Sequence, residues 1–468
     1  MIERDFYPFQ DSSYNDWIEQ IQKDLKGKDF DSTLTTKVWE HIKISPCYTK
    51  EVGSPFSHPI LFNQPSPYPG QNPRITSNIV SIFPEDEKSA NREILEALNN
   101  GAEGLVLHLT GKENLNHVLK GVFTEYIQIY FKPISNPSAM LSQIESWMES
   151  LSLRTDMLNG GILWSPSSSL FMGQEHWDQE ISTGISLLNC FKKFKNFFPI
   201  TIDLARYANA GGTGIQELTF GLGELVELLD AFVSKGISVS EAIEQFAFLA
   251  SAGELHFPEI AKLKVLRILI SELALNLGAS NSEDSFHLIV STSLWTKSRI
   301  DKNSNLIRQT YETMAGIIGG ANSIWVRPVS EKTASILEKR IARNVLTILK
   351  EESHLDKIMD PAAGAYFLED LEKQIHEKVL TQLAELEKNG GWKVNFNSRI
   401  IHEQIKSTRN VIQESVLQGD KKLVGVNKYQ GKAGTVENLS FEKIEEKDFE
   451  LLPSRASYLL EIQNLANS

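Results

Sequence analysis

The sequence is poor in cysteine and has no long apolar run, and each shortage excludes a class of protein. Only two cysteines, Cys47 and Cys190, occur among 468 residues, and they stand far apart without a CxxC spacing. Neither a disulfide framework nor a cysteine-based zinc site is therefore predicted. No apolar run approaches the roughly 18 to 20 residues that span a bilayer, and the first ten residues contain no signal-peptide core. We expect a cytoplasmic protein with no membrane partner.

Basic clusters and the common metal and nucleotide motifs are also missing. The 47 Lys and Arg residues are outnumbered by 60 Asp and Glu residues, which gives a net charge of −13. Nucleic acid is therefore not an expected partner, because its phosphates require basic patches. The ten histidines show no HxH, HxxxH or HExxH spacing, so no metal site is predicted. There is no G-x-S-x-G elbow, GxGxxG fingerprint or P-loop.

The first 73 residues are predicted to form an N-terminal region outside the main domain. Apolar residues recur at helical spacing over 12–25, which predicts an amphipathic helix. A threonine-rich extended stretch follows over 33–44, and then a segment over 45–73 whose prolines and glycines prevent a helix. We interpret this last segment as an arm that wraps its own domain or a partner subunit. A mobile linker is the alternative.

From about residue 75 the pattern alternates between short β-rich runs and helical periods. Eight such βα units favour a closed (β/α)8 barrel of the TIM type over an open doubly wound sheet. We place this α/β barrel at 74–330. A helical extension and tail follow over 331–468, with helices predicted at 331–352, 365–388 and 399–418 and a tail lying across a surface. The predicted strands cover 76–83, 104–109, 126–131, 161–164, 199–203, 246–250, 286–292 and 323–327.

A barrel of this kind carries its chemistry at the C-terminal ends of its strands. Those positions hold Ser81, His108, Ser165, Asp203 with Arg206, Ser251 with Glu254 and His256, Thr292, and Arg327.

Two features near these strand ends have a structural and a functional interpretation. The cluster Gly211, Gly212 and Gly214 opens a helix after a strand, where anions can bind, but a plain tight turn is the favoured interpretation. His108 alternates with two leucines, so it faces either the barrel interior or the helix layer, and a hydrogen-bonded structural role is favoured.

Several segments together resemble the methylmalonyl-CoA mutase family. Residues 341–371 read IARNVLTILKEESHLDKIMDPAAGAYFLEDL, similar to the family's ARNTQLIL-EE-(S/T) and DP-GGS-Y-(V/L)E-LT patterns. RQTYETMAGIIGGANS (308–323), PEIAKLKVLRI (258–268), GVNKY (425–429) and WEHIKISPCYT (39–49) also resemble family segments in the same order. The resemblance covers about residues 35 to 430 and implies a barrel.

The departures from the family pattern concern its catalytic groups. Catalytic members read SGYHMQEAGA at the fifth strand, where this chain reads DLARYANAGG (203–212), so Arg206 stands in place of a substrate-contacting His. A guanidinium is always charged and is larger than imidazole. Ser81 or a neighbour stands where the RQYAG tyrosine is expected. The segment LNGGILWSPSS (158–168) lacks the arginine that binds the substrate carboxylate. The resemblance thus implies that Ser81 and Arg206 are degenerate catalytic positions, and no catalytic residue is expected.

Catalytic members continue into a cobalamin domain with a DxHxxG motif, which this sequence does not contain. The resemblance therefore implies a non-catalytic small (beta) subunit, paired in a heterodimer with a catalytic alpha subunit that binds adenosylcobalamin. The alternative is a barrel subunit of a related acyl-CoA mutase with remade specificity and a separate cobalamin subunit. For that alternative the weak substrate-binding candidates are Asp203, Arg206, Thr292 and Arg327.

Overall fold

The computed structural model describes residues 12–39, 42–50, 76–134, 137–150, 158–279, 286–430 and 443–466. Most of the predicted arm, from residue 51 onward, lies outside the described residues, as does Glu442 at the start of the acidic run. No helix in the described ranges is long and apolar enough to cross a membrane.

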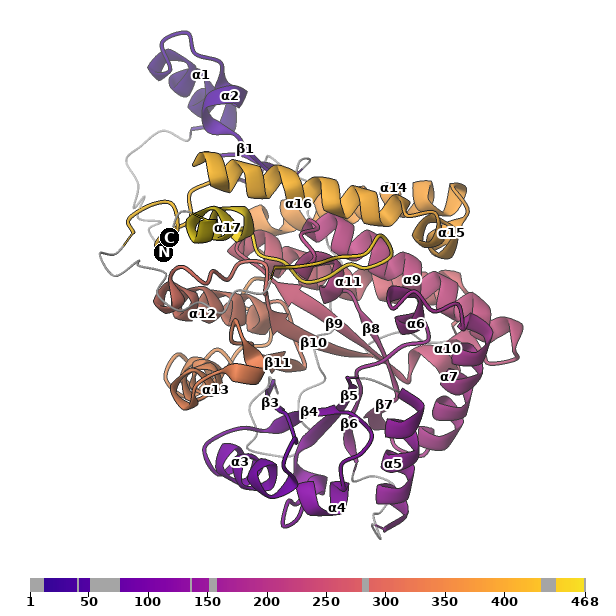
Figure 1. The fold of residues 1–468 in the computed structure, drawn as a ribbon. Helices are drawn as coiled ribbons and strands as arrows, with labels where there is room; N and C mark the ends of the chain where they lie inside the picture. Colours follow the sequence, from indigo (N-terminus) through magenta and orange to yellow (C-terminus); the bar gives the residue numbers. More distant parts are fainter. Residues whose placement is uncertain are drawn as a thin grey trace, which may run out of the picture.

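The described residues form a parallel barrel surrounded by helices (Figure 1), which confirms the predicted fold class. Each predicted strand segment has a counterpart. The strands, in the order in which they neighbour one another, are β7 (Asn196–Phe198), β6 (Asn159–Ile162), β5 (Gln128–Pro133), β4 (Gly104–Leu109), β3 (Ser77–Ile82), β11 (Ser323–Trp325), β10 (His287–Thr292), β9 (Phe246–Ala252) and β8 (Ile200–Asp203).

The barrel closes because β7 and β8 are the two halves of one strand. Pro199 separates them, and proline has no N–H to donate to a ladder. The first half pairs with β6 and the second with β9, all in parallel. Thr201 beyond the break also donates from its N to Trp164 O at 2.8 Å, just after β6. The nine strands of this sheet therefore form an eight-stranded closed barrel.

Side chains alternate along each strand between the barrel interior and the helix layer. The outward residues pack against the helices in two large apolar clusters. The inward residues fill the barrel axis with Trp325, Tyr130 and smaller neighbours, so the interior is a packed core. The buried members of this interior cluster are Ile79, Val106, Tyr130, Ala205, Ala247, Leu249, Ile289 and Trp325.

Helices connect the strands and form the outer layer. The main ones are α3 (Glu87–Asn99), α5 (Pro137–Ser150), α7 (Trp177–Phe191), α9 (Gly214–Ser234), α11 (His256–Asn276), α12 (Lys302–Ile318) and α13 (Ile336–Glu351). Shorter helical segments are α4 (Leu115–Val118), η1 (Thr124–Tyr126), α6 (Ser168–Phe171), α8 (Ala205–Asn209), α10 (Val239–Ile243) and η2 (Glu331–Thr333).

The N-terminal region stands apart from the barrel (Figure 1). It contains α1 (Tyr14–Asp24), α2 (Phe30–Leu34) and the antiparallel pair β1 (Thr36–Val38) and β2 (Ile42–Ile44). Within this described part of the chain, no residue of α1 or α2 is buried. The pair β1–β2 anchors the region to the barrel. Trp39, which follows β1, packs so closely against Gly214 of α9 that a Cβ on this glycine would come within 2.6 Å of the indole ring.

The C-terminal extension packs on one side of the barrel through α14 (Tyr366–Lys388), α15 (Gly391–Asn397) and α16 (Ile400–Gln418). The tail segment, which we define as residues 443–457, then runs back along α16 before α17 (Tyr458–Ala466) (Figure 1). Glu446 of this segment is paired with α16, because its Oε2 lies 2.5 Å from Arg409 Nη2.

Candidate functional site

The strand ends converge on a polar cluster at the C-terminal mouth of the barrel. Every second residue of a strand faces the barrel interior. By this alternation the interior side near the strand ends carries Ser81, His108, Lys132, Asp203 and, just after β11, Arg327. His108 therefore faces the barrel interior rather than the helix layer. The structure thus brings most of the predicted strand-end residues to one place.

Ser81 is the residue that the others of this cluster contact most. Its Oγ accepts a hydrogen bond from Trp325 Nε1 at 2.9 Å and lies 3.3 Å from His108 Nε2. The same hydroxyl donates to Glu331 Oε1. Burial lowers the pKa of His108 to about 3, so its imidazole is neutral at physiological pH. A hydroxyl with these three partners is fixed in place and has little hydrogen-bonding capacity left for a ligand.

Arg327 is neutralised by Glu331. Arg327 Nη2 lies 2.9 Å from Glu331 Oε2, and the two side chains are 13% and 11% exposed. Burial acts to raise the pKa of Glu331, but Arg327, His108 and Lys132 outweigh it, so the pKa is lowered overall. Thr292 holds the backbone of Arg327, since Arg327 N donates to Thr292 Oγ1 at 2.8 Å. Thr292 and Arg327 therefore support each other and the loop after β11.

Arg206 is also held by side chains of this chain. Its guanidinium lies 3.9 Å above the ring of Phe171 in a cation–π contact. Its Nε is 3.8 Å from Asp203 Oδ2, while its backbone N donates to Asp203 Oδ1 at 3.2 Å. Both charged groups of this pair are thus partly neutralised.

Lys132 is a mouth residue that the sequence interpretation missed, because the third strand was predicted to end at residue 131. Its ammonium lies 4.9 Å from the ring centroid of Trp325. Burial, reinforced by nearby Arg327, lowers the pKa of Lys132 to about 8, although Asp203 and Glu331 act in the opposite direction. Tyr130 faces the barrel interior, so the alternation of side chains along the strand could have identified Lys132, two residues later, as another interior residue.

Ser165 lies away from this cluster, in a buried site beneath α9. Its Oγ donates to Glu224 Oε1 at 3.3 Å, and Tyr207 OH donates to Glu224 Oε2 at 2.9 Å. Trp392 of α15 donates in turn from Nε1 to Tyr207 OH at 2.9 Å. Burial raises the pKa of Glu224. This group ties the C-terminal extension to the barrel.

Ser251, Glu254 and His256 do not converge on one point. Ser251 N donates to Glu217 Oε1 at 2.7 Å, whereas Glu254 pairs with Lys421. His256 Nδ1 lies 3.2 Å from Tyr311 O. Among the described residues, no group of three or more His, Cys, Asp or Glu could hold a metal ion.

The segment PEIAKLK forms part of the frame of the barrel rather than of the mouth. Lys262 Nζ lies 2.5 Å from both Glu217 Oε2 and Glu259 Oε2 and donates to Ser251 O at 2.8 Å. Burial raises the pKa of Glu217 to about 7 against the opposing effect of Lys262. These contacts link α9, α11 and β9.

The glycine cluster forms a tight turn. Thr213 caps α9 in a capping box, since Gln216 N donates to Thr213 Oγ1 at 3.2 Å and Thr213 N donates to Gln216 Oε1 at 3.0 Å. The backbone N–H groups of Thr213 and Gln216, which an anion would use, are therefore occupied, and Trp39 packs against Gly214. These contacts support the tight turn rather than an anion site.

The tail segment lies across loops that follow β6, β8 and β10. Ser454 N donates to Asn209 O at 2.8 Å and Ala456 N donates to Trp295 O at 2.9 Å. Phe449 packs so closely against Gly173 that a Cβ on this glycine would come within 2.8 Å of the phenyl ring. The chain thus covers part of its own C-terminal face.

Together, a closed (β/α)8 barrel with its polar residues gathered at the C-terminal mouth defines a TIM-type barrel protein. A family model described as methylmalonyl-CoA mutase matches residues 134–458. The chain belongs to the methylmalonyl-CoA mutase family.

Relatives named as small subunits match nearly the whole chain. The methylmalonyl-CoA mutase small subunit of Porphyromonas gingivalis is 26% identical over 440 residues, which cover 91% of this chain and 71% of the relative. The small subunit from Streptomyces virginiae is 25% identical over 443 residues, covering 90% and 71%. The methylmalonyl-CoA mutase of Escherichia coli is 28% identical over only 244 residues, covering 52% and 34%.

The methylmalonyl-CoA mutase family generally depends on adenosylcobalamin, and two features of the described residues concern the space and the ligands available to it. A cofactor that acts at a barrel mouth must approach the C-terminal face, and the tail segment lies across part of it. His402, a buried histidine of α16, already directs Nε2 to Phe449 O at 3.0 Å.

Proposed function

We propose that this chain is the non-catalytic small (beta) subunit of an adenosylcobalamin-dependent methylmalonyl-CoA mutase in the cytoplasm. Its partner is the catalytic alpha subunit, which binds the cofactor and interconverts (R)-methylmalonyl-CoA and succinyl-CoA. The observation that carries the proposal is the self-neutralised mouth, where Glu331 engages both Arg327 and Ser81. A substrate carboxylate would have to compete with that contact.

Two further observations support the loss of catalysis. The interior of the barrel is filled by Trp325 and Tyr130, which are fully buried. Arg206, at the position of the family's substrate-contacting His, stacks on Phe171 rather than facing an open site. A guanidinium held in this way cannot take over the role of a neutral imidazole.

The N-terminal region supports the pairing. The amphipathic helix α1 carries Tyr14, Trp17, Ile18 and Ile21 at helical spacing, yet within the described residues none of its side chains is buried. An apolar face of this kind is typical of a partner contact. In a heterodimer it would contribute to an obligate interface of roughly 2,000 Å² or more.

The test is co-expression with a full-length catalytic homologue. We expect a tight 1:1 complex with mutase activity, and no activity in the isolated chain. Failure to form the complex, or isomerisation of a carbon skeleton by the isolated chain, would refute the proposal. The alternative of a remade acyl-CoA mutase requires turnover of a branched or hydroxylated acyl-CoA when the chain is mixed with a separate cobalamin subunit.

A further inference from the structure

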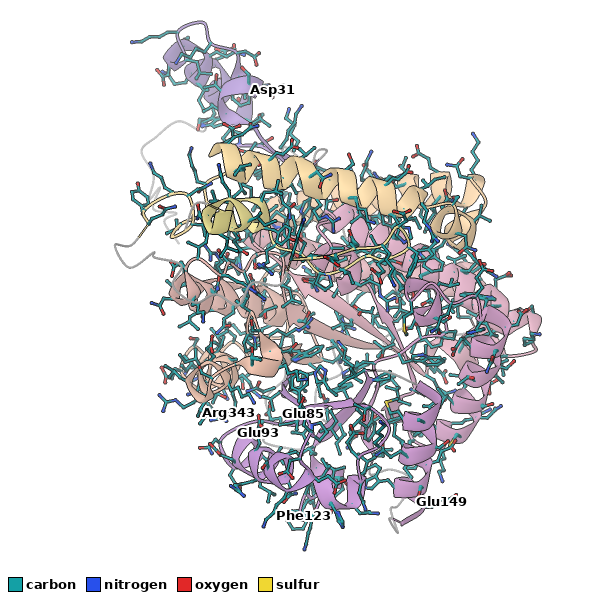
Figure 2. The ribbon with its side chains drawn as sticks, in the orientation of Figure 1. Asp31, Glu85, Glu93, Phe123, Glu149 and Arg343 are labelled. Atoms are coloured by element: carbon teal, nitrogen blue, oxygen red, sulfur yellow. The ribbon has the colours of Figure 1, made fainter. Side chains whose placement is uncertain are left out.

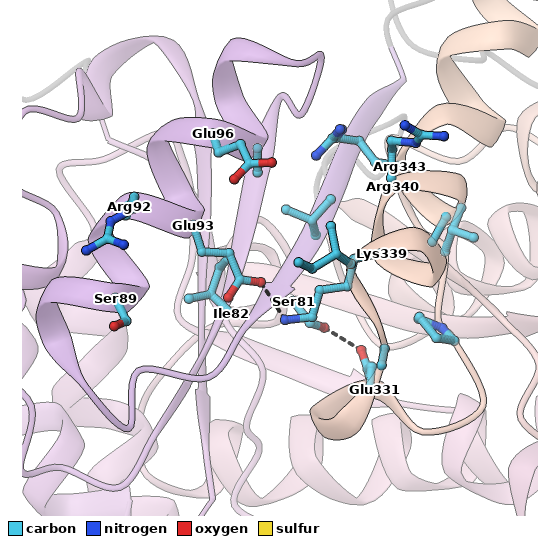
Figure 3. A pocket seen from close by; sticks show the side chains of 17 residues that line it. Ser81, Ile82, Ser89, Arg92, Glu93, Glu96, Glu331, Lys339, Arg340 and Arg343 are labelled. Atoms are coloured by element: carbon cyan, nitrogen blue, oxygen red, sulfur yellow. Dashed lines mark hydrogen bonds and ion pairs between the residues drawn. The ribbon is translucent and has the colours of Figure 1, made fainter.

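A cavity of about 300 Å³ lies beside the barrel mouth, between α3 and α13, and Ser81 and Glu331 of the mouth are among its lining residues. We call it the α3–α13 slot. Helix α3 follows β3, the first strand of the barrel, and α13 follows β11, the last. The ring of helices around the barrel therefore closes between these two helices. Both pack on β3. The ion pair between Lys339 Nζ and Glu93 Oε1, 2.6 Å apart, spans the gap between them (Figure 3).

The floor of the slot is apolar because small side chains face each other across it. Ala97 of α3 and Ala342 of α13 are each 6% exposed, and neither can fill the space between the helices. Val80, Ile82 and Val326 complete the floor. At the outer edge Ile336 is 82% exposed, so the apolar surface continues to the rim.

The rim carries a surplus of unpaired positive charge. Arg92, Arg340 and Arg343 line the slot. Arg92 acts electrostatically on Asp86 at the start of α3, whereas Arg340 and Arg343 have no guanidinium hydrogen bond or ion pair among the described residues. The Nε of Arg343 is buried without a partner. The side chains of Glu93, on α3, and Arg343, on α13, are labelled in Figure 2.

The carboxylates of the slot do not balance these arginines. Glu93 is engaged by Lys339, and Glu331 by Arg327 and Ser81. Glu96 is the remaining carboxylate of the lining. A buried guanidinium nitrogen without an acceptor is unfavourable, and a ligand that supplies an acceptor relieves the penalty.

We propose that the α3–α13 slot binds an aliphatic carboxylate of short to medium chain length. A planar guanidinium fork matches a carboxylate in two-point hydrogen bonding. The apolar floor accepts the hydrocarbon chain, and the volume is at the lower end of the range of about 300 to 1,000 Å³ typical of small-molecule pockets. This inference does not depend on the proposed function.

The test is titration of the purified full chain with octanoate, followed by calorimetry and by thermal unfolding. We expect saturable binding of octanoate and a rise in Tm. Neither 1-octanol, which has the alkyl chain without the carboxylate, nor inorganic phosphate, which has the negative charge without the chain, should produce them. Equal binding of octanol, or displacement of octanoate by phosphate, would overturn the proposal, since the slot would then recognise only apolar surface or only charge.

Variants locate the site. Arg340→Gln changes an exposed rim residue with little risk to folding, and Arg343→Gln removes the buried unpaired donor. Each should weaken octanoate binding by about tenfold or more. Lys88→Gln, on α3 but outside the lining, is the matched control and should bind as the parent does. Hydrogen exchange should show octanoate protection within α3 and α13. Unchanged binding in both arginine variants, or protection elsewhere, contradicts the site.

Discussion

Arg327 and Glu331 form an ion pair at the barrel mouth in which both Nε and Nη2 of the arginine donate to Oε2 of the glutamate, at 3.0 and 2.9 Å. The other carboxylate oxygen accepts from Ser81. One glutamate thus engages both the guanidinium of Arg327 and the hydroxyl of Ser81. Under the proposed non-catalytic role, charges paired in this way would stabilise the loops of the mouth rather than bind an anionic thioester.

The first prediction concerns Arg206. Arg206→Ala should leave the activity of the heterodimeric complex within about twofold, because a residue outside the reacting site contributes nothing to transition-state binding. The variant should lose the stacking on Phe171, worth about 0.5 to 2 kcal/mol, and the side-chain contact with Asp203. Steady-state kinetics of the purified complex measures this. A hundredfold fall in kcat would show that this barrel is catalytic.

Much of the fold was predictable from the sequence, for a physical reason. Buried parallel strands are short apolar runs separated by helical periods, and the eight runs correspond to the observed strands. The fifth run was predicted to begin at Pro199, and β8 begins one residue later, at Ile200. What the sequence could not show is that β7, on the other side of that proline, belongs to the same strand.

The contacts of the mouth were less predictable. A helix was expected from Glu331 onward, but Ser335 caps α13 through a capping box with Glu338, so the helix begins at Ile336. Glu331 is instead in a 3₁₀ turn that directs it to Ser81. Which carboxylate neutralises which cation depends on distances across the barrel, and no sequence spacing records them.

A second prediction concerns the pH dependence due to Lys132. Its pKa is about 8 in the folded protein against an ordinary 10.5, so the unfolded chain binds more protons between these values and stability rises with pH across that window. At pH 7, below both pKa values, the full free-energy cost of burying the charged ammonium of Lys132 is present. Lys132→Met should therefore raise the free energy of unfolding by about 1 to 3 kcal/mol at pH 7, with a smaller gain near pH 10.

Denaturant unfolding at the two pH values measures this gain, and the exposed Lys112→Met is its control. A loss of stability at pH 7 in Lys132→Met would show that the ammonium is stabilised by its neighbours.

A third prediction concerns acid lability. Burial lowers the pKa of His108 and of His287 to about 3, so each stays neutral in the fold while the unfolded chain protonates near 6.5. Stability should fall as pH drops from about 6.5 towards 3, by up to about 1.4 kcal/mol per pH unit for each histidine. His287→Gln should make this decline shallower.

His287 Nε2 lies 2.7 Å from Tyr130 OH and 2.9 Å from Ser323 Oγ, so the variant will also lower stability at neutral pH. The diagnostic quantity is therefore the slope of stability against pH. The exposed His354→Asn is the control variant, and an equal slope in His287→Gln would contradict the assignment.

A fourth prediction concerns the pairing helix. Trp17→Glu places a charge on the apolar face of α1, whose residues are not buried within the described part of this chain. The barrel should keep its Tm, because the ring contacts of Trp17 are with Tyr14 and Phe30 of the N-terminal region, but the affinity for the catalytic subunit should fall by about tenfold or more. Glu19→Gln, an exposed change on the same helix, is the control. Unchanged affinity in Trp17→Glu would exclude α1 from the interface.

The most direct measurement is the cobalamin content of the purified 1:1 complex, by absorbance against protein concentration. If this chain supports a catalytic partner and binds no cofactor, the complex contains one cobalamin, and the isolated chain takes up none. Two cobalamins per complex, or tight binding by the isolated chain, would contradict the account.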